Sequence, residues 1–91
     1  MAISNRQNGN FTTRNTALAA YLYSEGFNLL DVEIGTHPSN SNFTIATFIF
    51  ESNDRLLECT RLFQMAKAEG NLVLFYEAYR KCLKMIKIGK L

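Results

Sequence analysis

The chain has 91 residues, a formal net charge of +2 at pH 7 and a hydrophobic fraction of 47%. This length predicts one domain with a modest core, and the balanced composition excludes a wholly disordered chain. No run reaches the roughly 18 apolar residues of a membrane helix, and no apolar leader follows Met1. We therefore expect a cytoplasmic protein with no membrane partner.

Residues 1–10 are mostly Ser, Asn, Gln and Gly. This composition predicts a flexible polar tail ahead of a single domain over residues 11–91. The two cysteines, Cys59 and Cys82, belong to no CxxC motif and have no histidine nearby. That spacing indicates small core residues in a reducing compartment rather than a disulfide or a zinc site.

The first helix is expected over residues 11–26. Thr12 or Thr13 is the expected N-cap, because a threonine hydroxyl can accept a hydrogen bond from an unpaired amide of the first turn. Gly26 is expected to end the helix in the left-handed conformation, which allows Phe27 to fold back onto the helix in a Schellman arrangement.

Two strands should follow, joined by a loop over residues 35–42 that is rich in Gly, Ser and Asn. The first strand, residues 28–34, alternates apolar and acidic side chains, which is typical of a half-buried strand. The second, residues 43–50, is the longest uncharged β-branched and aromatic run of the chain. Because both its even and its odd positions are apolar, we expect it in the middle of the sheet, with a helix on one face and either a second layer or a partner subunit on the other.

A second helix is expected to begin at residues 52–54 and to stop at Gly70. A short extended link over residues 71–73 then leads to a third helix over residues 74–88, which has no internal Gly or Pro. The expected fold is therefore α+β: a small single domain in the order α-β-β-α-α, with an antiparallel two-stranded hairpin packed on helices.

Charge is segregated along the chain. All eight acidic residues lie between Glu25 and Glu77, whereas residues 78–91 carry five basic residues and no acidic one. At 100° per residue, three of these cations share the outer side of the third helix. With Tyr76 at the border of the stripe, they form a candidate nucleic-acid-binding surface. Its residues are Tyr76, Arg80, Lys81, Lys84, Lys87 and Lys90.

Two other interpretations of this stripe remain open. The lysines can simply solvate the outer face of a packed helix and complement its dipole, with Glu77 and Lys81 forming an ordinary i,i+4 pair. A basic amphipathic helix can also lie on a membrane surface, but here the apolar side is needed for the core.

Catalytic signals are absent from the sequence. His37 stands alone beside Pro38, without the partner that a catalytic base needs. Asp31 and Glu33 are interpreted as the solvated face of an edge strand rather than as an acid–base pair. No phosphate-binding glycine loop, zinc-protease motif or CxxC motif occurs. We therefore expect no enzyme, no metal, no cofactor and no small-molecule substrate.

Four segments carry a resemblance to a known family: Phe-Thr-Thr at residues 11–13, "ALAAYLYSEGF", "FIFE" and "YEAYRKCLKMIK". Together they resemble short domains of phage and prophage genes that are named only as a domain of unknown function. The resemblance spans residues 11–88. It implies a viral or mobile-element origin, with the protein in the host cytoplasm or in a virion, and it transfers no catalytic residue.

Two hypotheses for the function follow. The first is a small non-enzymatic nucleic-acid-binding accessory protein of a phage or mobile element, which would use the basic C-terminal helix. The alternative is a structural or adaptor protein, such as a virion or assembly component, that acts as a homodimer or larger homo-oligomer. The two-sided apolar strand and the polar tail motivate this alternative.

Overall fold

The computed structural model describes residues 9–37 and 39–90, excluding the side chains of residues 37 and 40–43. The expected tail thus lies outside the described residues, apart from Gly9 and Asn10. The Gly9 carbonyl accepts a hydrogen bond from the Ser52 amide at 2.8 Å, and Asn10 begins the first strand.

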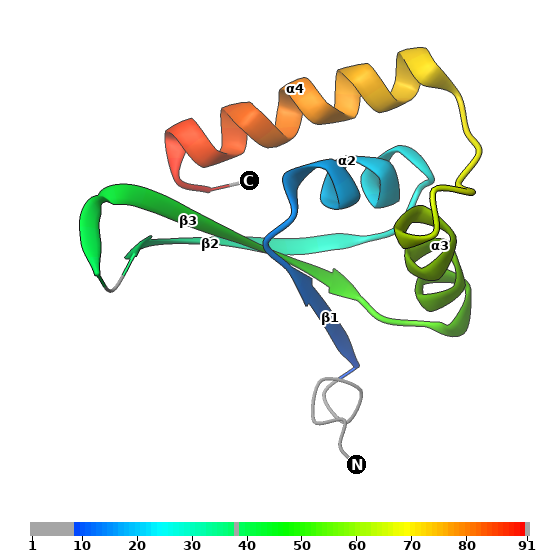
Figure 1. Ribbon diagram of the computed structural model, residues 1–91, viewed down its shortest axis with the longest axis horizontal. Coiled ribbons are helices and arrows are strands. Elements are labelled where there is room, and N and C mark those ends of the chain that lie inside the picture. Colours follow the sequence, from blue (N-terminus) through cyan, green and yellow to red (C-terminus); the bar gives the residue numbers. More distant parts are fainter. Residues whose placement is uncertain (1–8, 38, 91) are drawn as a thin grey trace.

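Within the described residues, three helices and a three-stranded antiparallel sheet form the fold (Figure 1), which confirms the α+β class. The elements follow in the order β-α-β-β-α-α, so the expected order α-β-β-α-α and the two-stranded sheet were wrong. Their bounds are β1 (Asn10–Thr13), α2 (Thr16–Ser24), β2 (Leu29–His37), β3 (Asn40–Glu51), α3 (Asp54–Gln64) and α4 (Leu72–Ile88).

Strand β1 occupies part of the segment that was expected to begin the first helix. Its residues Phe11–Thr12–Thr13 are aromatic or β-branched and pair with the end of β3, in the register Phe11↔Phe50 and Thr13↔Phe48. Helix α2 therefore starts at Thr16, and its N-cap is Asn15, whose Oδ1 accepts a hydrogen bond from the Leu18 amide at 3.1 Å. The expected N-caps Thr12 and Thr13 instead belong to the sheet.

The end of α2 matches the expectation. Glu25 is the C-cap, and Gly26 has a φ of 91°. The Gly26 amide donates to the Tyr23 carbonyl at 3.1 Å, and the Phe27 amide donates to the Leu22 carbonyl at 3.2 Å. These two bonds define a Schellman motif, which turns the chain from α2 toward β2.

Strand β3 lies in the middle of the sheet, as predicted, with the strand order β1-β3-β2. Both strands extend further into the hairpin than expected, so that most of the predicted loop over residues 35–42 is strand. Ala46, Phe48 and Phe50 point into the core, and the last two are fully buried. Helices α2 and α4 lie on this side of the sheet, while α3 sits near the end where β3 stops (Figure 1).

The other face of β3 is only half-buried. Ile45, Thr47 and Ile49 are partly exposed to solvent, and no described helix covers them. The described residues supply no second layer over this face, so its expected cover by a partner subunit stays a prediction. The apolar area of isoleucines on a sheet face is removed from water only when another layer or subunit covers that face.

Helix α2 is buried on most of its surface, since Leu18, Ala19, Ala20, Tyr21 and Leu22 are all core residues. It lies between the sheet and α4, and its alanines allow these layers to approach closely. A helix enclosed in this way has no exposed polar face to form an amphipathic pattern.

Helix α3 ends six residues before the predicted stop at Gly70. Its C-cap is Met65, and the following Ala66 adopts a left-handed φ of 60°. The Ala66 amide donates to the Phe63 carbonyl at 3.0 Å, and the Lys67 amide donates to the Leu62 carbonyl at 2.8 Å. This is a second Schellman motif, with alanine in the place that glycine usually takes.

Replacing Ala66 by Gly is therefore expected to raise the free energy of unfolding by about 1 kcal/mol, because a left-handed conformation costs a residue with a Cβ roughly this much. Urea unfolding followed by circular dichroism measures the change. Ala68→Gly, at a neighbouring position without a positive φ, should destabilise instead. Equal losses in both variants would contradict the assignment of a strained Ala66.

Helix α4 begins at Leu72, so the extended link expected over residues 71–73 is not present. Asn71 is the N-cap and accepts a hydrogen bond from the Leu74 amide at 3.0 Å. Gly89 ends the helix with a φ of 91°. Ala78 and Cys82 are the buried residues of this helix, whereas Leu83 is 46% exposed.

Candidate functional site

The outer side of α4 carries the predicted cations. Arg80, Lys81, Lys84 and Lys87 are all exposed, and Lys90 follows just after the helix end. We refer to these five residues as the basic face. At 100° per residue, Arg80, Lys84 and Lys87 lie opposite the buried Ala78 and Cys82, whereas Lys81 lies on the flank of the helix.

None of these five cations forms an ion pair within the described part of the chain. The ion pairs there are Arg55–Glu25 and Arg61–Glu58, both away from α4. The expected Glu77–Lys81 pair is not formed, and the Lys81 Nζ instead lies 5.8 Å from the centre of the Tyr23 ring. The positive charge of the basic face is thus not neutralised by neighbouring carboxylates.

Two shallow hollows follow the basic face. The first, of about 370 Å³, is lined by Glu77, Arg80, Lys81 and Lys84. The second, of about 320 Å³, continues from Lys81 and Lys84 toward the C-terminal end of α4 and adds Met85, Ile88 and Lys90. Together they give the cations a surface against which an anionic chain can lie.

Tyr76 is placed where the spacing predicted it, at the border of the basic face. Its side chain is 60% exposed, and the Arg80 guanidinium lies 6.0 Å from the ring centre. An exposed aromatic ring beside a cation provides a stacking surface for a nucleobase. The same ring is also compatible with a purely structural cation–π contact.

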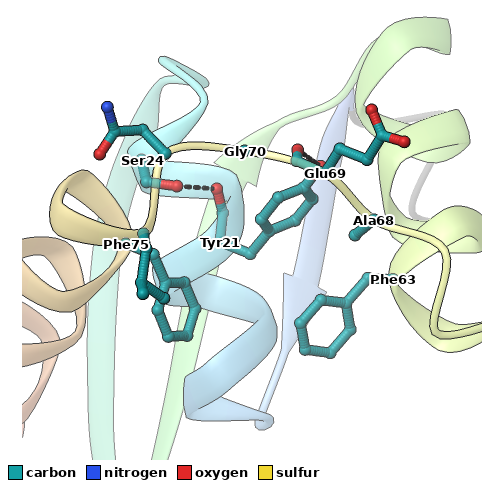
Figure 2. Close-up of a pocket in the computed structure, with 9 residues that line it drawn as sticks. Tyr21, Ser24, Phe63, Ala68, Glu69, Gly70 and Phe75 are labelled. Atoms are coloured by element: carbon teal, nitrogen blue, oxygen red, sulfur yellow. Dashed lines mark hydrogen bonds between the residues drawn. The ribbon is translucent and has the colours of Figure 1, made fainter.

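An aromatic pocket that the sequence analysis missed lies where α2, α3 and α4 meet (Figure 2). It has a volume of about 220 Å³ and is lined by the rings of Tyr21, Phe63 and Phe75. The Tyr21 and Phe63 rings stack with centres 5.7 Å apart. Each ring comes from a different helix, so no local spacing in the sequence could have indicated the pocket.

The hydroxyl groups of this pocket are already engaged. The Tyr21 hydroxyl donates to the Glu69 carbonyl at 2.9 Å, and the Ser24 hydroxyl donates to the Tyr21 carbonyl at 2.7 Å, as Figure 2 shows. Burial, followed by the Glu25 charge, raises the pKa of Tyr21. The pocket thus offers an apolar surface the size of a side chain rather than acid–base chemistry.

The cysteine thiols are poor nucleophiles at neutral pH. Burial raises the pKa of Cys82 to about 11, and burial is also the main cause of the raised pKa of Cys59. Both thiols therefore remain protonated near pH 7, where only the thiolate reacts readily. They are free rather than joined in a disulfide.

Other candidate chemistry is sparse in the residues that the structure describes. Asp31 and Glu33 are exposed on strand β2. The described part of the chain contains no cluster of His, Cys, Asp or Glu that could hold a metal ion. The side chain of His37 lies outside the described part. Among the described helices, none is both long enough and apolar enough to cross a bilayer.

Comparison with known proteins gives a family without an assigned role. The family described as Domain of unknown function (DUF5659) matches residues 8–88, which include all the helices and strands that the structure describes. No curated protein and no solved structure matches the chain at a significant level. The chain therefore belongs to the DUF5659 family.

Proposed function

We propose that the protein binds nucleic acid through the basic face of α4. The observation that carries this proposal is that five exposed cations lie along the end of one helix without a carboxylate partner in the described residues. Unpaired cations are available to replace the counterions of a phosphate backbone, and the release of those counterions drives binding.

Contacts of this kind recognise the backbone rather than the bases. Arg80 can contact a phosphate with two parallel hydrogen bonds, whereas the lysines act as point charges. Tyr76 adds a ring on which an unpaired base can stack, which would favour single-stranded nucleic acid over duplex. We therefore expect binding with little sequence preference.

The wider setting is part of the same proposal. The resemblance to phage and prophage domains supports a non-enzymatic accessory protein of a phage or mobile element, acting in the host cytoplasm or carried in a virion. The thiols that remain protonated and the engaged hydroxyls of the aromatic pocket support a binding protein rather than an enzyme.

A second candidate function, as a structural or adaptor protein, is favoured by the start of α4. Leu72 is 80% exposed, Val73 64% and Leu74 49%, and Leu72 also lines the aromatic pocket. Exposed apolar side chains beside an apolar pocket are typical of protein–protein contacts. This surface lies at the opposite end of α4 from Lys84, Lys87 and Lys90.

The test of nucleic-acid binding is fluorescence anisotropy with labelled single- and double-stranded DNA at two salt concentrations. Four phosphate contacts should weaken the affinity by about 10²-fold between about 50 and about 200 mM salt, because the slope of log K against log salt is close to −0.9 per contact on duplex DNA. Failure to bind at low salt, or an affinity that does not respond to salt, would overturn the proposal.

A further inference from the structure

The sheet has a surface that the proposed function does not use. We call it the open face, the side of the sheet away from α2 and α4 (Figure 1). Strand pairing places its residues side by side, since Thr12 and Asp31 flank Ile49 and Glu33 lies beside Thr47. The open face consists of Thr12, Asp31, Glu33, Ile45, Thr47 and Ile49.

The centre of the open face is apolar and hollowed. Ile45 and Ile49 stand on either side of Thr47 along β3, and all three are half-buried. A hollow of about 270 Å³ passes over Ile45 and Thr47, and Gly35, opposite Ile45 in the register, contributes no side chain to fill it. This surface can therefore receive apolar side chains from a second molecule.

The charges of the open face are arranged asymmetrically across the strands. Asp31 and Glu33 are exposed on the β2 side, whereas Arg14 follows β1 directly and lines the same hollow as Glu33 and Thr47. Within the described residues, none of these three charged groups has an ion-pair partner. One side of the face is thus acidic and the other basic, with apolar side chains between them.

We propose that the occupant of the open face is a second copy of this chain, related by a two-fold axis that runs parallel to β3 over Thr47. Such an axis places β1 of each copy opposite β2 of the other, so that Arg14 faces Glu33 of the second copy twice. A two-fold axis that runs across the strands at Thr47 would instead place β2 over β2, with Glu33 opposite Glu33 of the second copy, and like charges repel. Charge therefore selects one orientation.

Pairing of sheet edges is a weaker alternative for self-association. The Val32 amide, on edge strand β2, donates to the Asp31 Oδ1 at 2.8 Å, so this amide is not available to an added strand. Strand β1, on the opposite edge, has only four residues. The open face is thus the larger free surface of the sheet.

The proposed dimer is independent of nucleic-acid binding, because α4 lies on the opposite side of the sheet from the open face. A three-stranded surface is small for an interface, so we expect a dissociation constant in the micromolar range. Packing the two sheets together would leave both basic faces on the outside of the dimer.

The decisive experiment is a charge exchange followed by sedimentation equilibrium. Wild-type protein should show a concentration-dependent dimer. Arg14→Glu and Glu33→Arg should each weaken the dimer by about tenfold, and the double variant should restore it to within about threefold of wild type, because it rebuilds the same pairs with the signs reversed. Lys87→Glu, on the basic face, is the control and should leave the dimer unchanged.

A cross-linking measurement covers the case in which a charge variant does not fold. Thr47→Cys should be joined to its copy by a short thiol cross-linker, since both copies of residue 47 lie beside the axis, whereas Lys67→Cys, in the connection between α3 and α4, should not. A wild-type monomer at all concentrations up to about 1 mM, a double variant no stronger than the single ones, or equal cross-linking at both positions would overturn the proposal.

Discussion

Replacing Phe48 by Ala is expected to lower the free energy of unfolding by about 3–5 kcal/mol. The Phe48 side chain is fully buried in the middle of β3, between Thr13 of β1 and Val32 of β2. Its removal leaves a cavity in the core. Small domains are stable by only about 5–15 kcal/mol, so the variant should lose much of its stability. Urea unfolding followed by circular dichroism measures this loss.

The matched control is Ile49→Ala at the next position of the same strand. Ile49 points to the open face and is half-buried, so its truncation should cost about 1 kcal/mol, at a protein concentration below that at which the chain dimerises. A similar loss for both variants would contradict the one-sided burial of β3.

The sequence predicted the centre of the sheet because β3 carries a long apolar signal that no other segment matches. Strand β1 was missed for the opposite reason. Four residues are too few for an alternating pattern, and Phe11–Thr12–Thr13 becomes a strand only because the end of β3 is available to pair with it. Tertiary pairing here overrides the local signal.

The starts of the helices share one signal in the sequence. Asn15, Asn53 and Asn71 are the three N-caps, and each accepts a hydrogen bond from the amide of a leucine three positions later. Asn-x-x-Leu is therefore a repeated signal in this chain. The end of α3 was harder to predict from the sequence. Ala66 there adopts a left-handed conformation that glycine usually takes, and its residue type does not indicate this.

The three surfaces of the molecule also differ in how far the sequence could predict them. Exposure of the basic face could be predicted from helical spacing, because α4 is uninterrupted and one side of it is apolar. The aromatic pocket and the open face could not. The first brings together Tyr21, Phe63 and Phe75 from three helices, and the second depends on which face of β3 the helices cover. Both are consequences of the topology rather than of any one segment.

Replacing Arg80 and Lys84 together by Ala is expected to weaken binding to duplex DNA by about 10- to 100-fold at low salt. If both side chains contact phosphates, the slope of log K against log salt should also fall by about 1.8, at close to 0.9 for each lost contact. The side chains are exposed and lie on the outer side of α4, so the fold should be unaffected. Anisotropy titrations across a range of salt concentrations measure both quantities.

The control is Arg61→Ala with Lys67→Ala, which removes the same net charge from α3 and the connection that follows it. If binding depends only on the overall charge of the protein, both double variants should weaken it equally, because long-range attraction is largely insensitive to where a charge sits. If α4 contacts the phosphates, only the Arg80/Lys84 variant should change the salt slope. Equal slopes in the two variants would therefore rule out the basic face as the binding surface, even if the wild-type protein binds DNA.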